Sequence, residues 1–360
     1  MAIQCRDVVN AAVLGGCLLG GGGGGSKKDG FALGRLAVQA GDPVLVDMDE
    51  VPDDALLVTV ALVGSPASEN AHAKPVHYQR SLQILLDALD EKVFGLISNE
   101  NGAVGTVNGW FQSAMTGLPV VDCPCNGRAH PTGIMGAMNL DQVPEYLAWQ
   151  AFAGGDAGEN RYIEGVIRGR LETAARLVRE ASVGAGGLVA VARNPVSATH
   201  ARLNGAPGAI RQAIELGKII EANAGSGGMR TAEVCALALG GSVVMAGVVT
   251  GIDMETKSGF DVGRVLVEDG SSIAELKFWN EYMTLSLSGL SGKAERVGSF
   301  PDLISTIDEE SGTPVTTSEI RQGMKVAVLW ASKERLRLGS GMRRTDLLGD
   351  VEQVIGEAII

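Results

Sequence analysis

The segment Pro119–Pro131, with sequence PVVDCPCNGRAHP, gathers most of the side chains that could perform covalent or acid–base chemistry. A thiolate close to an arginine and a histidine has a lowered pKa and can attack an electrophilic carbon, so Cys123 or Cys125 is a candidate nucleophile. His130 would then act as the base that activates the thiol. The segment therefore predicts a thiol-dependent catalytic site.

The same segment supports two other interpretations. One is a metal site, in which the C-x-C pair and His130 bind one zinc-like ion and Asp122 supplies a fourth ligand. The other is structural, with both thiols buried as small apolar groups and Arg128 paired with Asp122. In a catalytic site, Arg128 could instead hold a substrate carboxylate through two parallel hydrogen bonds. The sequence by itself leaves these alternatives open.

Glu100 comes shortly after the apolar run Val93–Ser98, which is typical of a buried strand. Asp122 ends the run Leu118–Asp122, a second predicted strand. Because the carboxyl ends of parallel strands meet at one edge of a sheet, we expect Glu100 and Asp122 to lie close together there. Glu100 would serve either as a general acid or base, or as the cap of the next helix.

Two polar residues, Asn280 and Glu281, interrupt the apolar segment KFWNEY. Strand alternation predicts that Asn280 lies mid-strand among apolar neighbours, where a polar group needs a hydrogen-bond partner. It would either reach a cleft or tie two strands together. Asn280 and Glu281 are therefore candidate substrate-binding residues.

Six consecutive glycines, Gly20–Gly25, precede Ser26. They satisfy the G-x-G-x-x-G spacing of dinucleotide-binding loops, but that motif needs a preceding strand, and a helix is predicted over residues 8–19. A flexible connector is a second interpretation, although ordering six glycines costs much backbone entropy. The interpretation we favour is a backbone floor whose N–H groups face a small anionic or carbonyl ligand. Its candidate substrate-binding residues are Gly22, Gly23, Gly24, Gly25 and Ser26.

Predicted strands and helices alternate over residues 1–239, which indicates a three-layer α/β domain with a mostly parallel sheet. From residue 240 to 340, long strand-like runs separated by Gly, Ser and Asp predict a β-rich domain, either a barrel or a sandwich. A last helix at 345–360 is expected to pack back on the first domain. Another helix is expected around residues 163–174, because its apolar positions share one helical face. Those positions are Ile163, Val166, Ile167, Leu171 and Ala174.

The chain has 360 residues and a formal charge of −12. This acidic balance, without a basic stripe, argues against nucleic acid as a partner. No apolar run approaches the roughly 20 residues of a membrane helix, and five cysteines without framework spacing fit a reducing compartment. We expect a cytoplasmic homo-oligomer that binds a small molecule and needs no cofactor, with one zinc-like ion as the alternative.

Several motifs occur in a defined order along nearly the whole chain. They are LLGGGGGG (18–25), Glu100 placed 17 residues before GLPVVD, GRAHP (127–131), SGFDVGRV (258–265), FWNE (278–281), PDLISTIDEESGTPVTT (301–317) and IRQGMKVAVL (320–329). As an ordered set, they resemble the S-methyl-thiohydantoin desulfurase-like family.

That resemblance implies a three-layer α/β domain, a β-barrel-like domain, and hydrolysis of a hydantoin-like ring or its thio analogue. The family is often encoded near hydantoinase/oxoprolinase-type proteins, so a hydantoinase-like protein is a candidate partner. The sequence departs from the family pattern at Pro124, where an acidic residue is usual, at His130, where an aromatic is usual, and at residues 100–105, where E-x-G-G-x-N is usual. The positions that correspond to the family's glycine loop, glutamate and D…GRA-P segment are Gly22–Gly25, Glu100, Asp122, Gly127 and Arg128.

We therefore expect a hydrolase that acts on a small cyclic amide, imide or thiohydantoin. Cys123 or Cys125 would be the nucleophile, and Glu100 and His130 would transfer protons. Backbone N–H groups of Gly22–Gly25 would stabilise the developing oxyanion. A non-catalytic binding subunit of a hydantoinase-like complex is the alternative, and a metal-dependent hydrolase is a further one.

Overall fold

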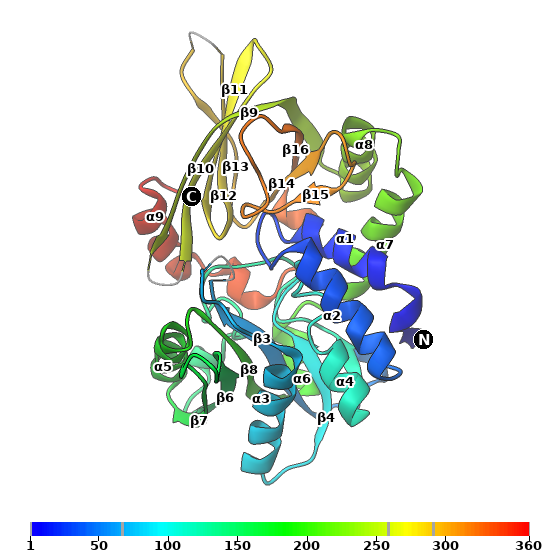
Figure 1. The fold of residues 1–360 in the computed structure, drawn as a ribbon, viewed down its shortest axis with the longest axis vertical. Coiled ribbons are helices and arrows are strands. Elements are labelled where there is room, and N and C mark those ends of the chain that lie inside the picture. The colour runs from blue at the N-terminus through cyan, green and yellow to red at the C-terminus, as the bar shows by residue number, and fades with distance from the viewer. Residues whose placement is uncertain (1, 66–67, 258–259, 290–291, 360) are drawn as a thin grey trace.

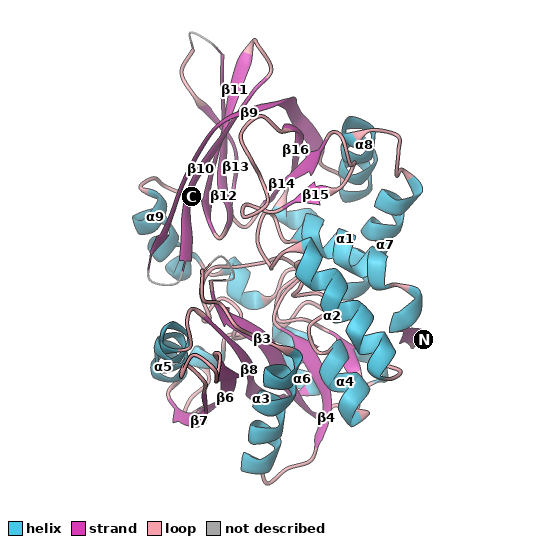
Figure 2. Cartoon of the chain, viewed as in Figure 1, coloured by secondary structure: helices cyan, strands magenta, loops and turns pink. Residues whose placement is uncertain are grey.

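The computed structural model describes residues 2–65, 68–257, 260–289 and 292–359. Within these residues the strands form two eight-stranded sheets, one above the other in Figure 1. Most helices surround the lower sheet, as the colouring by secondary structure in Figure 2 shows. The two-domain organisation, α/β first and β-rich second, is confirmed. Residues 258–259, which begin one of the family-like motifs, lie outside the described residues.

The first sheet is mixed rather than mostly parallel. Three neighbouring pairs are parallel, β2–β5, β5–β4 and β4–β3, and the four other pairs are antiparallel. Most of the antiparallel pairs use strands from residues 148–197, where β6 and β7 are adjacent in sequence and need no crossover helix. In spatial order the strands are β1 (Ile3–Gln4), β2 (Val44–Asp47), β5 (Val120–Asp122), β4 (Val93–Ser98), β3 (Leu56–Gly64), β8 (Leu188–Ser197), β6 (Ala148–Gly154) and β7 (Ile163–Gly169).

Helices cover both faces of this sheet. Val58 and Val60 of β3 pack with α3 (Pro75–Ala88), whereas Ala61 packs with α5 (Leu171–Gly184) on the opposite face. Burial on both sides explains why β3 is a continuous apolar run in the sequence. The other helices of this domain are α1 (Val9–Leu19), α2 (Lys27–Ala40), α4 (Trp110–Thr116), α6 (Ala198–Asn204) and α7 (Ala209–Ala222).

The prediction of a helix across residues 163–174 is wrong in its first half. Residues 163–169 form β7, an edge strand paired with β6, and α5 begins only at Leu171. Half-buried and exposed side chains alternate along β7, with Ile163 and Ile167 packed on the core and Glu164 exposed. Apolar residues four apart satisfy both a strand and a helix period, so the local pattern was ambiguous.

The second sheet is antiparallel throughout its described pairs. The pairings among described residues follow a linear order with β13 and β15 at the two edges. The strands in that order are β13 (Glu295–Ser299), β12 (Glu281–Gly289), β11 (Ser272–Trp279), β10 (Phe260–Glu268), β9 (Ser242–Lys257), β16 (Lys325–Ala331), β14 (Leu303–Asp308) and β15 (Pro314–Val315).

Two helices flank the second sheet. α8 (Gly228–Leu239) packs against β9 and β16, and α9 (Leu348–Ile355) packs against β10 and β11. The last helix therefore lies on the second sheet (Figure 1), not on the first domain as expected. Val351 buries its side chain there, and Glu357 beyond the helix pairs with Lys277 of β11. Among the described residues, no helix has the length and apolar character needed to cross a bilayer.

Candidate active site

A cavity of about 410 Å³ lies where the two domains meet. Its wall combines the glycine loop, Gly22–Gly25, with the residues that follow β4, helix α5, and the turn between β11 and β12. The volume falls in the range of roughly 300–1,000 Å³ that is usual for pockets enclosing small molecules. A ligand in this cavity would contact both domains.

The glycine loop is held by hydrogen bonds on both sides. The carbonyl oxygen of Gly22 accepts from the Thr317 amide of the second domain (2.9 Å), and that of Gly24 accepts from the Val104 amide of the first (2.9 Å). Within the described ranges, the amides of Gly22, Gly24 and Gly25 donate to no acceptor. These hydrogen bonds hold the loop to both domains, and the amides of Gly22, Gly24 and Gly25 stay available for a ligand.

Close neighbours explain why two of these positions are glycine. Gly24 has a φ of 78°, and a Cβ on it would lie 2.4 Å from the Cα of Gly102. A Cβ on Gly23 would lie 2.4 Å from Oε1 of Glu281. The bare backbone thus lets the carboxyl of Glu281 lie directly against the loop.

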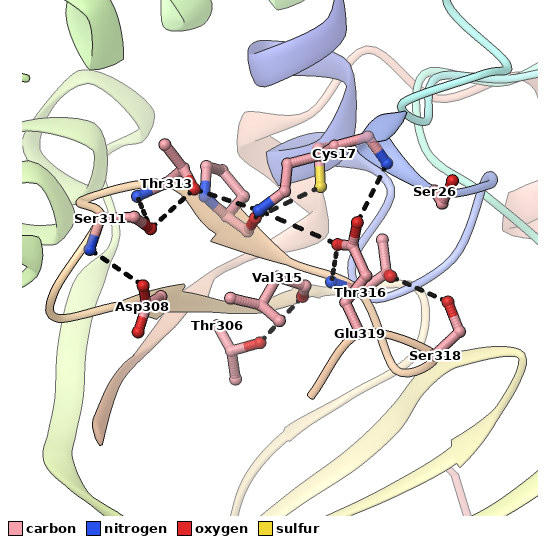
Figure 3. Close-up of polar contacts among 12 residues, drawn as sticks. Cys17, Ser26, Thr306, Asp308, Ser311, Thr313, Val315, Thr316, Ser318 and Glu319 are labelled. Carbon is pink, nitrogen blue, oxygen red and sulfur yellow. Dashed lines mark hydrogen bonds and ion pairs between the residues drawn. The ribbon is translucent and has the colours of Figure 1, made fainter. Parts of the chain in front are cut away.

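The cavity rim joins the start of α2 to the segment Thr313–Glu319 of the second domain (Figure 3). The Lys27 amide donates to Oε1 of Glu319 (3.2 Å), and its ammonium group donates to Oγ1 of Thr313 (3.0 Å). The other carboxylate oxygen of Glu319 accepts from the Thr316 amide (3.2 Å). Ser26, at the N-cap of α2, lies beside this network. These contacts fix the glycine loop against the second domain.

Glu100 follows β4 and directs its carboxyl into the cavity wall. Its Oε2 accepts from the His130 amide (3.3 Å) and from Nδ2 of Asn99 (3.4 Å). Burial raises the pKa of Glu100 to about 7, and the His130 amide and the charge of Arg193 offset only part of that effect. The carboxyl therefore releases its proton at a much higher pH than an exposed glutamate does.

Glu281, the first residue of β12, brings a second carboxyl from the other domain. It is 3% exposed, and its Oε2 has no hydrogen-bond partner among the residues that the structure describes. Burial raises the pKa of Glu281 well above its ordinary value, and the neighbouring charge of Glu100 raises it further. Both carboxyls therefore hold their protons to a higher pH than exposed glutamates do.

His130 lies beside Glu100 as a neutral ring. Its Nδ1 is 2.9 Å from the carbonyl oxygen of Thr132, which can only accept, so Nδ1 carries the proton. Nε2 then accepts from Nδ2 of Asn99 (2.9 Å) and lies 3.3 Å from Oε2 of Glu100. Burial and the charge of Arg193 lower the pKa of His130 to about 3. The ring therefore stays neutral near pH 7, and the contact from His130 that orients Glu100 is the hydrogen bond donated by its backbone amide.

Arg128 and Asp122, two of the predicted site residues, are bound to other parts of the protein. Arg128 is fully buried, donates to the carbonyl oxygens of Asp302 and Tyr282, and stacks 4.8 Å over the ring of Phe300. It therefore ties the first domain to the second. The carboxyl of Asp122 accepts from the Ile210 amide (2.8 Å) at the start of α7, so it caps that helix and is not paired with Arg128.

The two cysteines lie outside the cavity wall. Cys123 donates to the carbonyl oxygen of Ala201 (3.3 Å), and Sγ of Cys125 lies 3.4 Å from Oγ1 of Thr59. Burial raises the pKa of Cys125 to about 11 and that of Cys123 further. In the part of the chain that the structure describes, no group of three His, Cys, Asp or Glu side chains is placed to hold a metal ion.

Two family models together match most of the chain. The model described as the S-Me-THD-like N-terminal domain matches residues 7–159, and that of the S-Me-THD-like C-terminal domain matches residues 170–345. The chain belongs to the S-Me-THD-like family. The resemblance seen in the sequence is therefore confirmed. The second family domain begins near α5, so β8 is a strand of the first sheet and α5 covers one of its faces, although both belong to the C-terminal family domain.

The fold of this S-Me-THD-like protein is also similar to an X-ray crystal structure of a protein from Chromobacterium violaceum. The two share a TM-score of 0.73 and 21% sequence identity, over 99% of this chain and 96% of the other. Identity at that level shows a common fold alone. No curated protein matches the chain.

Asn280 of this S-Me-THD-like protein lines the cavity, but it does so from a turn rather than from mid-strand. It connects β11 to β12 with a φ of 58°, a left-handed conformation that asparagine tolerates better than most residues. Its amide donates to the carbonyl oxygen of Asp261 (2.7 Å), and its Oδ1 accepts from the Asp261 amide (2.9 Å). The turn places the adjacent Glu281 at the cavity.

Among the cavity residues of the S-Me-THD-like site that had not been predicted are three that contact Glu100 or carry charge near the two glutamates: Asn99, Arg179 and Arg193. Arg193 follows the apolar run 187–192. An arginine at the end of a buried strand is unusual, so its position could have indicated a functional residue. Asn99 is next to Glu100 and could have been included on that ground. Arg179 gave no signal, because an arginine on an amphipathic helix is usually solvated.

The buried thiols lead to a direct prediction. Changing Cys123 or Cys125 to alanine should leave kcat within about threefold of the wild-type value, because neither thiol reaches the cavity and both stay protonated near neutral pH. Steady-state kinetics on the two purified variants would measure this. Loss of turnover in a variant with an unchanged melting temperature would instead support the hypothesis that a cysteine thiol is the nucleophile.

Proposed function

We propose that the protein is a hydrolase for a small ring of the cyclic amide, imide or thiohydantoin class. The observation that supports this most is the carboxyl pair, Glu100 and Glu281, which reaches one cavity from two domains with raised pKa values. Carboxyls with raised pKa values in one pocket are typical of acid–base catalysis. Membership of a family described as S-Me-THD-like points to the ring class.

The two carboxyls divide the proton transfers of hydrolysis. Glu100, with a pKa of about 7, is partly ionised at neutral pH and accepts the proton of the attacking water. Glu281, with its pKa raised well above the ordinary value, keeps its proton and donates it to the leaving ring nitrogen or sulfur. The water oxygen bonds to the ring carbon, and the bond from that carbon to the leaving atom breaks.

The glycine loop and His130 support this chemistry without exchanging protons. We assign the amides of Gly22, Gly24 and Gly25, which donate to no acceptor among the described residues, to the carbonyl oxygen on which negative charge develops. Removing one such donor from comparable sites costs roughly a hundredfold or more in kcat. The amide of His130 and Nδ2 of Asn99 both donate to Oε2 of Glu100 and hold that carboxyl in one orientation.

The proposal is tested by incubating the full chain with hydantoin, 2-thiohydantoin and S-methyl-2-thiohydantoin and following the products by liquid chromatography and mass spectrometry. We expect turnover of at least one ring, and loss of at least about a hundredfold in kcat for Glu281→Gln, which cannot donate a carboxyl proton. Turnover that is unchanged in Glu281→Gln would contradict the assignment of the acid.

The alternative, a binding subunit without its own activity, predicts the opposite result in the same assay. Such a protein would bind one of the rings, show no turnover alone, and gain activity only with a hydantoinase-like partner added. That outcome would overturn the hydrolase proposal.

A further inference from the structure

Two guanidinium groups, those of Arg179 and Arg193, line the inner part of the cavity. The other charged groups in or directly behind this part of the wall are the guanidinium of Arg128 and the carboxyls of Glu100, Asp261, Glu281 and Asp302. Burial raises the pKa values of Glu100 and Glu281, which weakens the negative charge that they set against the guanidinium groups. The other charged residues of the wall, Asp29, Glu172 and Arg176, are exposed at the rim, where solvent screens them.

Arg193 is one of the arginines that line the cavity. It is 4% exposed and donates from Nη2 to Oδ1 of Asn99 (2.8 Å). Its Nη1 has no hydrogen-bond partner among the described residues and lies beside Gly133, another residue of the wall, whose Cβ position is 3.6 Å away. Its Nε is also unpartnered within those residues. Buried polar groups are usually hydrogen-bonded, so a buried guanidinium whose Nε and Nη1 both lack partners indicates a binding site for a ligand.

Arg179 reaches the same cavity from α5. Its guanidinium stacks 4.2 Å over the ring of Phe260, which belongs to the second domain and also lines the cavity. Burial and the charge of Arg193 together lower the pKa of Arg179 to about 10, against the opposing effect of Glu281, so the two guanidinium groups repel each other. A ligand anion between them would relieve that repulsion.

We propose that the ring substrate carries a carboxylate, and that Arg179 and Arg193 bind this carboxylate while the ring lies between the glycine loop and the glutamate pair. The inference rests on the proposed function, because it names the substrate class for the same site. A carboxylate is favoured over a neutral substituent because a planar guanidinium forms two parallel hydrogen bonds with it. Arg128 cannot serve in this role, because its guanidinium is bound to Asp302 and Tyr282 behind the wall.

The test compares two ligands that differ in charge but hardly in shape, hydantoin-5-acetic acid and hydantoin-5-acetamide. Binding of each is measured by titration calorimetry to the full-length Glu100→Gln protein, in which turnover is blocked. We expect the acid to bind about 10- to 100-fold more tightly than the amide. Adding Arg179→Gln should reduce that preference to within about threefold, and Arg179→Lys should retain part of it.

Arg168→Gln is the matched control. Arg168 also stacks on an aromatic ring, that of Trp149 at 5.0 Å, but it is exposed and lies outside the cavity wall. We expect it to leave the preference for the acid unchanged. Equal binding of acid and amide would overturn this inference while leaving the hydrolase proposal intact. Preferential binding of the acid without turnover of any ring by the wild-type protein would support the carboxylate site and overturn the hydrolase proposal.

Discussion

Glu100→Gln should lower kcat by at least about a hundredfold and, at the same time, raise the free energy of unfolding above neutral pH. The loss of turnover follows from the loss of the proposed base, since general-base catalysis typically contributes 10²–10⁴-fold. The gain in stability follows from the burial of the carboxyl, which raises its pKa from the ordinary 4.5 to about 7. Sites selected for function often carry such a cost in stability.

The sign of the pH dependence follows from the proton balance of Glu100. Between pH 4.5 and 7 the unfolded chain has released this proton while the folded chain still holds it, so stability falls as the pH rises across that window. Above pH 7 both states are ionised and the full penalty is present. Glutamine does not ionise, so the variant should be more stable by on the order of 1–3 kcal/mol at pH 8 and nearly unchanged at pH 5.

Urea unfolding at pH 5 and pH 8 would measure the difference. Glu91→Gln is the control, because Glu91 is an exposed residue just before the same strand, β4. It should change neither kcat nor the pH dependence of stability. Equal destabilisation by Glu100→Gln at both pH values would contradict this prediction. It would mean that the hydrogen bonds of the carboxyl stabilise the fold and that its buried charge does not lower the free energy of unfolding.

Gly217→Ala should cause the largest loss of stability of any single methyl addition that we consider. Helices α1 and α7 cross with their backbones in contact, so a Cβ on Gly217 would lie 1.8 Å from the carbonyl oxygen of Ala11. The reciprocal contact is as close, with a Cβ on Gly15 1.7 Å from the carbonyl oxygen of Ala213. Backbone atoms of two packed helices cannot yield as a side chain can, so we expect a loss of about 3 kcal/mol or more.

The effect should reach the site as well, because α1 leads directly into the glycine loop. Thermal and urea unfolding would measure the loss, with Gly184→Ala as the control. Gly184 is the last residue of α5, is exposed, and has nothing within 4 Å of its Cβ position. There alanine should be neutral or stabilising by up to about 1 kcal/mol. A melting temperature of Gly217→Ala close to wild type would mean that the two helices can separate without cost.

The sequence determined by itself those features that depend on neighbours along the chain. The predicted strand at residues 93–98 coincides with β4, and Glu100 lies just after it at the cavity, because a short apolar run bounded by polar residues specifies a strand locally. The glycine run was recognisable as a wall candidate because its composition is unusual, and the order of motifs was enough to indicate the family.

Only the tertiary structure decided which chemical groups meet. Glu281 and Arg179 come from distant parts of the chain, and no local pattern indicates that they share a cavity with Glu100. The same holds for Cys123, whose thiol beside Arg128 and His130 in the sequence suggested a reactive site. Burial against Ala201, more than seventy residues away, raises its pKa instead. Nucleophilicity and proton affinity depend on desolvation and on charges in space, and long-range packing sets both.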